Sequence, residues 1–227
     1  MIKMLDDKFA YFYQKKAFGP AVGVRPVSEH TLSKYRGKLP NKLLEYWEAY
    51  GFAGYGRGIF WMTDPDEYTD VVEAWLERTR FSDADNYYVI GRSAFGELML
   101  WGTRSGPSIT IQCPWGMIFP ADKSRWMNEG KQDFLISTWI AGLNHDGLDQ
   151  TDEAEAPLFE RAHKLLGHLA PDEMYGFVPA LAMGGPCRIS NLQKVKAVEH
   201  LMLLAKLAEP EVMRDIVKEI KDQGLWK

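Results

Sequence analysis

Four short runs of aromatic and β-branched residues lie about ten residues apart in the middle of this 227-residue chain. Gly, Pro and Ser separate the runs, a spacing typical of neighbouring strands joined by tight turns. The pattern therefore predicts an antiparallel meander. The runs are Tyr87–Ile90, Leu98–Trp101, Ile109–Ile111 and Met117–Phe119.

Helical patterns lie on both sides of this meander. Apolar residues recur there at helical spacing, and Pro, Gly and capping residues mark where the helices begin and end. The predicted fold class is α+β, in which an antiparallel sheet with flanking helices forms a domain over residues 1–143. The predicted helices are 1–17, the segment from Pro40 to Gly51, the segment that begins at Asp64, and 134–143, with a strand at 58–62 between the second and third.

Residues 132–160 contain no Lys or Arg but seven acidic residues. The part from Asn144 to Ala156 is the predicted linker, and residues 157–227 are predicted to form a smaller, mainly helical domain. Its helices are expected to start at Pro157, to cover 192–207 and to cover 212–221. The segment Met174–Ala180 is predicted to be a loop.

Composition and charge narrow the class of protein. With 46% hydrophobic residues and a net charge of −4, the chain has the composition of a globular protein and lacks the basic character of a nucleic-acid-binding protein. Cys113 and Cys187 lie far apart, and they indicate neither a disulfide framework nor a zinc site. Acidic residues near the N-terminus argue against a signal peptide, and no apolar run is long enough to span a membrane. We therefore expect a cytoplasmic protein.

No motif in the sequence indicates catalysis. The glycine-rich segment 51–58 follows a helix and precedes a strand, which is the reverse of the order in a phosphate-binding loop. Asp64 and Glu67 are explained as helix-capping residues. The five histidines have no metal-ligand spacing, and no GxSxG motif is present. We expect no enzyme activity, no cofactor and no bound metal.

Several residues are candidates for contact with another protein. The acidic run from Asp146 to Glu155 is either a solvated linker or an electronegative surface that attracts a basic partner, such as the DNA-binding face of a nuclease. The loop 174–180 is either a seam between domains or a partner hot spot. The residues expected to be exposed and partner-binding are Tyr55, Arg57, Asp149, Asp152, Glu153, Tyr175 and Phe177.

Three stretches of the sequence together resemble a known family. The first includes Phe18-Gly19-Pro20 and Leu43-Leu44-Glu45-Tyr46-Trp47, the second Gly58-Ile59-Phe60-Trp61 and Ala94-Phe95-Gly96-Glu97-Leu98, and the third Pro171-Asp172-Glu173-Met174-Tyr175-Gly176-Phe177. The first two stretches resemble the GAD-like domain, and the third resembles the C-terminal domain that accompanies GAD-like domains in type VI secretion immunity proteins. Together they cover most of the chain in the family's order.

The resemblance implies an immunity protein that binds and neutralises a cognate type VI effector, typically a DNase, by occluding or distorting its active site. It implies no direct binding of nucleic acid or membrane. An alternative function is a regulatory protein that binds a small ligand. Its pocket would lie between the two domains and would be lined by Trp61, Trp101 and Phe177.

Overall fold

The computed structural model describes residues 5–215. Its centre is an eight-stranded sheet in the order β1-β2-β3-β4-β5-β6-β7-β10. All neighbouring strands are antiparallel except β10, which runs parallel to β7. The strands are β1 (Val22–Arg25), β2 (Phe52–Tyr55), β3 (Phe60–Met62), β4 (Tyr87–Ser93), β5 (Glu97–Gly102), β6 (Gly106–Gln112), β7 (Met117–Pro120) and β10 (Glu211–Val212). The predicted α+β class and the meander β4–β7 are confirmed.

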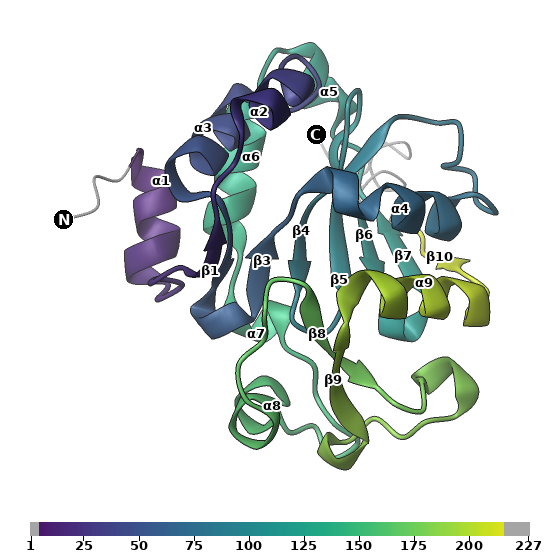
Figure 1. Ribbon diagram of the computed structural model, residues 1–227. Coiled ribbons are helices and arrows are strands. Elements are labelled where there is room, and N and C mark those ends of the chain that lie inside the picture. Colours follow the sequence, from purple (N-terminus) through teal and green to yellow (C-terminus); the bar gives the residue numbers. More distant parts are fainter. Residues whose placement is uncertain (1–4, 216–227) are drawn as a thin grey trace, which may run out of the picture.

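Helices cover both faces of this sheet (Figure 1). On one face lie α1 (Asp7–Ala10), its continuation η1 (Tyr11–Lys15), α2 (Glu29–Tyr35), α3 (Asn41–Tyr50), α5 (Ser124–Asn128) and α6 (Gln132–Gly142). On the other face, η3 (Pro65–Tyr68) leads into α4 (Thr69–Leu76), which packs beside α9 (Ala197–Leu207). The molecule therefore has three layers.

Alternation along the strands divides the interior into two cores. Ile90, Met99 and Trp101 belong to the core under α1, α3 and α6, which is rich in aromatic residues. Their neighbours Val89 and Leu98 belong to the core under α4 and α9, which is mostly aliphatic. Because successive strand residues point to opposite faces, one strand supplies both cores.

The C-terminal part contains a second sheet of two antiparallel strands, β8 (Glu173–Phe177) and β9 (Leu192–Lys196). It lies at the lower end of the large sheet together with α7 (His145–Leu148) and α8 (Phe159–Leu166) (Figure 1). Short turns complete this end: η2 (Gly56–Gly58), η4 (Cys113–Trp115), η5 (Leu181–Met183) and η6 (Ile189–Asn191).

A buried arginine ties this small sheet to the large one. The Arg92 side chain is 0% exposed, and its guanidinium donates hydrogen bonds to the carbonyl oxygens of Pro171 (2.9 Å) and Glu173 (2.7 Å) and to the Tyr68 hydroxyl (3.0 Å). The Tyr175 amide donates to the Ala94 carbonyl at 2.8 Å. Residues from both predicted domains also share both cores.

Several predicted elements differ from the structure. The expected single helix 192–207 is a strand followed by a helix, because residues 192–196 pair with β8 in an antiparallel ladder. The expected loop 174–180 contains most of β8 for the same reason. At the end of the chain, Val212 lies in β10 rather than at a helix start, and residues 216–221 of that expected helix lie outside the described residues.

Candidate protein-binding surface

The aromatic residues expected to be exposed are buried, so this part of the prediction is wrong. Tyr55 and Tyr175 are 0% exposed and Phe177 is 2% exposed. Tyr55 lies in β2, which is paired on both sides, and its ring packs edge-on against Phe12. The Tyr175 hydroxyl donates to the Gly167 carbonyl at 2.6 Å. All three side chains hold the interior together and cannot reach a partner from the folded state.

Arg57 is exposed, as expected. It has a left-handed backbone conformation (φ 61°) in η2, and its guanidinium forms an ion pair with Glu160 of α8. This pair links a turn of the large sheet to the C-terminal part. Contact between Arg57 and a partner remains a prediction.

Two acidic residues of the predicted linker fasten it in place. The Asp149 Oδ1 accepts hydrogen bonds from the amides of Gln150 (2.7 Å) and Phe159 (2.8 Å). The Asp152 Oδ1 accepts from the amides of Ala154 (2.9 Å) and Ala156 (3.0 Å), and its Oδ2 pairs with Arg161 at 2.6 Å. Residues 144–156 therefore form an ordered turn packed on α8.

The two carboxyl groups have opposite pKa shifts. Burial raises the pKa of Asp149 because it disfavours the charged form. The hydrogen bond from Arg161 lowers the pKa of Asp152. Both groups accept hydrogen bonds that hold the turn, so replacing either of them with Lys perturbs the turn itself.

Other acidic side chains of this segment face solvent. Asp146, Glu153 and Glu155 are exposed. Glu153 pairs with Arg188 at 2.8 Å, while Asp146 and Glu155 have no ion pair within residues 5–215. We call these three side chains the acidic surface. Its three carboxylates place negative charge on the exposed side of residues 144–156.

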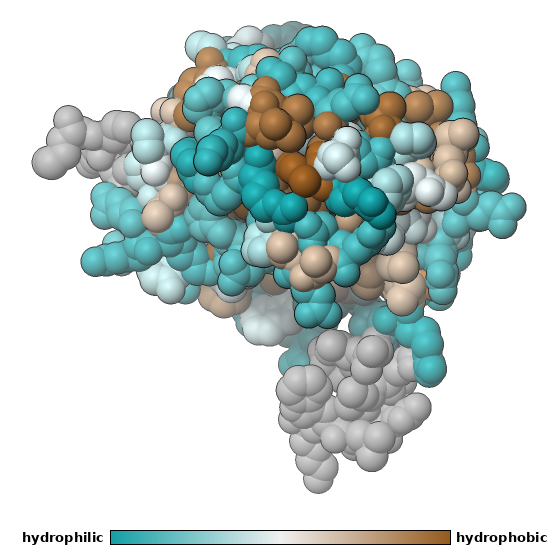
Figure 2. All heavy atoms as spheres, turned by 90° about the horizontal axis from the view of Figure 1, so that it is seen from below, coloured by the Kyte–Doolittle hydropathy of each residue, from teal (hydrophilic) through white to brown (hydrophobic). Residues whose placement is uncertain are grey.

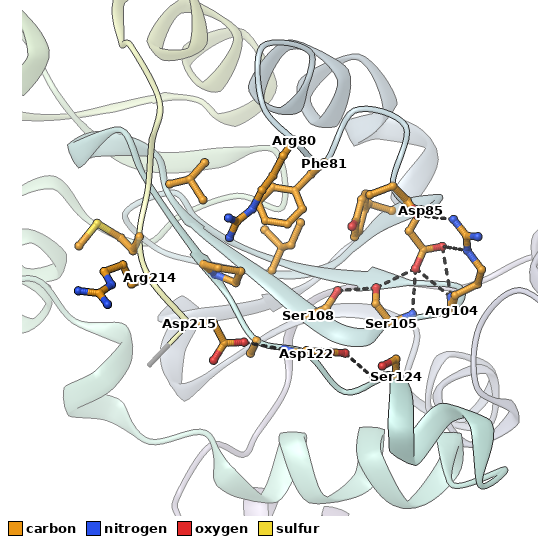
Figure 3. Close-up of a pocket in the computed structure, with 17 residues that line it drawn as sticks. Arg80, Phe81, Asp85, Arg104, Ser105, Ser108, Asp122, Ser124, Arg214 and Asp215 are labelled. Atoms are coloured by element: carbon orange, nitrogen blue, oxygen red, sulfur yellow. Dashed lines mark hydrogen bonds and ion pairs between the residues drawn. The ribbon is translucent and has the colours of Figure 1, made fainter. Parts of the chain in front are cut away.

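The pocket expected between the domains is absent from the described part of the chain, because its three lining residues belong to the core. Trp61, Trp101 and Phe177 are at most 2% exposed. A hollow of about 750 Å³ lies at the opposite end of the large sheet, beside β6, β7 and residues 80–87 (Figure 3). Its arginines do not converge. Arg104 lies at one end beside Asp85, Arg80 lies near the middle beside Phe81, and Arg214 lies at the other end (Figure 3).

Two histidines lie close together at the end of α8. His163 Nε2 and His168 Nδ1 are 3.0 Å apart, because the chain turns back at Gly167 (φ 81°) after α8. Burial and the neighbouring His168 and Arg57 lower the pKa of His163. The pair lacks a third ligand: residues 5–215 contain no group of three His, Cys, Asp or Glu side chains that could hold a metal.

The thiol of Cys113 is buried, and burial raises its pKa well above the ordinary value. Such a thiol is a poor nucleophile at neutral pH, because the thiolate is the reactive form. Separately, none of the helices within 5–215 has the length and apolar character needed to cross a membrane.

Comparisons with known proteins identify both parts of the chain. Residues 9–115 match the model of the GAD-like domain, and residues 136–208 match the C-terminal domain of the T6SS immunity protein Tdi1. No curated protein matches the chain. The crystal structure of Atu4351 from Agrobacterium tumefaciens is similar in fold, with a TM-score of 0.77 at 20% identity over 87% of this chain and 89% of that one. This chain therefore contains a GAD-like domain, followed by a domain that matches the C-terminal domain of the T6SS immunity protein Tdi1.

Proposed function

We propose that this protein binds and neutralises a cognate type VI DNase effector by covering its DNA-binding surface. The observation that carries the proposal is the match of residues 136–208 to the Tdi1 C-terminal domain. This segment includes the acidic surface as well as β8, β9 and α9.

The charge of the acidic surface fits such a partner. A nuclease gathers Lys and Arg side chains where it binds the phosphates of DNA. Carboxylates on an inhibitor attract the same groups and speed the encounter, mainly through the association rate. Occupation of that surface excludes the nucleic acid without any chemistry by the inhibitor.

Co-expression with the product of the adjacent gene tests the proposal. Cells that express the neighbour alone should lose viability and degrade their DNA, and co-expression should rescue both and yield a complex that co-purifies. The purified complex should neither cleave nor bind duplex DNA. A neighbour that is toxic but neither bound nor neutralised would contradict the proposal.

The contribution of the acidic surface is tested by Asp146→Lys, Glu153→Lys and Glu155→Lys combined. Asp149 and Asp152 are left intact because they hold the turn. We expect the association rate to fall at least about tenfold at low salt and to lose much of its salt dependence. The matched control reverses three exposed acidic residues elsewhere, Glu48, Glu77 and Asp83. Equal effects of the two triple variants would show that only the total charge matters.

A further inference from the structure

An exposed tryptophan lies at the same end of the molecule as the acidic surface. Trp115 ends η4, the turn between β6 and β7, and is 43% exposed. Its indole N–H donates to the Gln150 side-chain oxygen at 2.9 Å, which joins it to the acidic segment. Within the part of the chain that the structure describes, no other ring or cation covers the indole.

Exposed apolar side chains also lie on the two elements that η4 contacts. The turn η4 contacts both η5 and α9. Met183 of η5 is 65% exposed, and Leu203 and Leu207, one turn apart on α9, are 48% and 36% exposed. On α9 these two leucines lie next to His200 and Leu204, which face η5 and Pro114. We call Trp115, Met183, Leu203 and Leu207 the apolar ridge.

Two segments that carry exposed acidic residues contact this turn. Gln150, bonded to the indole, belongs to the segment that carries Glu153 and Glu155. The chain after α9 returns to the turn, where the Glu211 amide donates to the Gly116 carbonyl at 2.8 Å, and both Glu209 and Glu211 are exposed. We call the carboxylates of Glu153, Glu155, Glu209 and Glu211 the acidic rim. In the view from below, apolar side chains gather within a largely hydrophilic surface (Figure 2).

This combination specifies the chemistry of a partner. Tryptophan is strongly enriched among the few interface residues that carry most of the binding free energy, particularly where less important contacts exclude water around it. An acidic rim requires a partner recess bordered by Lys or Arg, and the DNA-binding surface of a nuclease supplies such a border.

We propose that Trp115 is the anchor with which this protein docks on the basic, DNA-binding surface of its toxin, with the apolar ridge filling a recess and the flanking carboxylates pairing with the surrounding cations. This inference rests on the proposed function and assigns the docking surface within it. The ridge excludes water around the indole, and the acidic rim sets the orientation.

The test compares Trp115→Ala with Trp126→Ala in the full-length protein. Trp126 is a matched control because it is 39% exposed but lies on α5, and its ring stacks on Phe134. Binding of the co-purifying effector is measured by calorimetry after both variants are shown to be folded by circular dichroism. We expect Trp115→Ala to weaken binding at least ~30-fold and Trp126→Ala to change it less than about threefold.

A second variant probes the rim independently of the indole. Combined Glu209→Lys and Glu211→Lys should slow association and reduce displacement of a labelled DNA duplex from the effector. If the wild-type protein binds no effector, the proposed function fails. If it binds and neutralises the effector but Trp115→Ala and the rim variant bind as tightly as the wild type, the docking surface is wrong.

Self-association of this protein is the remaining alternative for the ridge. Sedimentation velocity without effector distinguishes it. If Trp115→Ala converts a dimer into a monomer while the affinity for the effector stays constant, the ridge joins two copies of this chain and the proposal is overturned.

Discussion

The two ends of the large sheet each expose a tryptophan, and the two side chains have different surroundings. At one end, Trp126 stacks on Phe134 with ring centroids 5.9 Å apart, and the Lys131 ammonium lies 4.5 Å from its ring centre. At the other end, Trp115 has one hydrogen bond from its edge, to Gln150. The two side chains are therefore similarly exposed, but the ring of Trp126 packs against other side chains, whereas the ring of Trp115 is available to a partner.

The ends also differ in how they are assembled. Strand register places Gly102, Gly106 and Pro120 at the Trp126 end, and Glu97, Gln112 and Met117 at the Trp115 end. At the Trp126 end, Asp85 accepts hydrogen bonds from residues 103–105, about 20 positions later, and the Asp122 amide donates to the Asp215 carboxylate. The Trp115 end joins η4 to residues about 35 and 95 positions later. A surface gathered from distant segments depends on the anchors that hold them.

Arg92→Met should have the largest effect, because Arg92 is such an anchor. The change leaves the half-buried carbonyl oxygens of Pro171 and Glu173 without their donor, and we expect a loss of about 3 kcal/mol in the free energy of unfolding. Urea denaturation measures this loss. Hydrogen exchange should show the strands β8 and β9 opening before α5.

The control is Arg188→Met, which removes an exposed ion pair with Glu153. Exposed pairs contribute little, so the change should cost less than about 1 kcal/mol. Equal losses for the two variants, or uniform loss of exchange protection at both ends of the sheet, would contradict the role of Arg92 as an anchor for one end.

Substitution of one aspartate at each end, Asp85 and Asp149, compares how strongly the two carboxylates stabilise their turns. The Asp85 side chain is 2% exposed, and its oxygens accept hydrogen bonds from the Thr103 and Ser105 hydroxyls and from the amides of Arg104 and Ser105. Asp85→Asn places an amide NH₂ against these donors and should cost about 2 kcal/mol at pH 7. Asp149→Asn should cost less than about 0.5 kcal/mol, since one retained oxygen can accept both of its amide hydrogen bonds.

The pH dependence of these two variants should have opposite signs. The pKa of Asp85 is lowered, because the opposing effect of burial is outweighed by the hydrogen bonds that its carboxylate accepts. Its contribution is therefore present above the unfolded pKa of about 3.9 and is lost as the pH falls through the folded value, so the deficit of Asp85→Asn should shrink in acid. The pKa of Asp149 is raised, so the wild type gains stability relative to Asp149→Asn as the pH falls. Parallel pH profiles of urea denaturation would contradict this assignment.

The sequence predicts features set by local pattern and misses features set by pairing between distant segments. The meander is correct because strand runs and turns repeat along the chain, and α3 ends at Gly51 as its C-terminal glycine indicates. The prediction of a helix over residues 192–196 is wrong, because pairing with the earlier strand β8 decides their conformation and the local apolar pattern does not show it.

The candidate surface follows the same rule. The sequence shows that residues 132–160 contain acidic residues and no Lys or Arg. It does not show that residues 144–156 form a hydrogen-bonded turn. Tyr55, Tyr175 and Phe177 were expected at the surface because Gly and Pro near them suggested loops, whereas two-sided pairing or packing buries them. Trp115 lies in a Cys-Pro-Trp-Gly turn that gave no separate signal, since exposure of one aromatic residue among many is decided by tertiary packing.

The smallest effect we expect is on the stability of the free protein. Trp126→Ala should be the more destabilising of the two tryptophan substitutions, although Trp115→Ala should weaken effector binding more. Trp126→Ala removes a stacked ring and a cation–π contact and should cost about 1 kcal/mol in the free energy of unfolding. Trp115→Ala loses one exposed hydrogen bond and should cost less than about 0.5 kcal/mol. Urea denaturation of both variants gives the comparison. If Trp115→Ala were the more destabilising change, the indole would be a packing residue, and a loss of effector affinity in that variant would no longer identify a binding anchor.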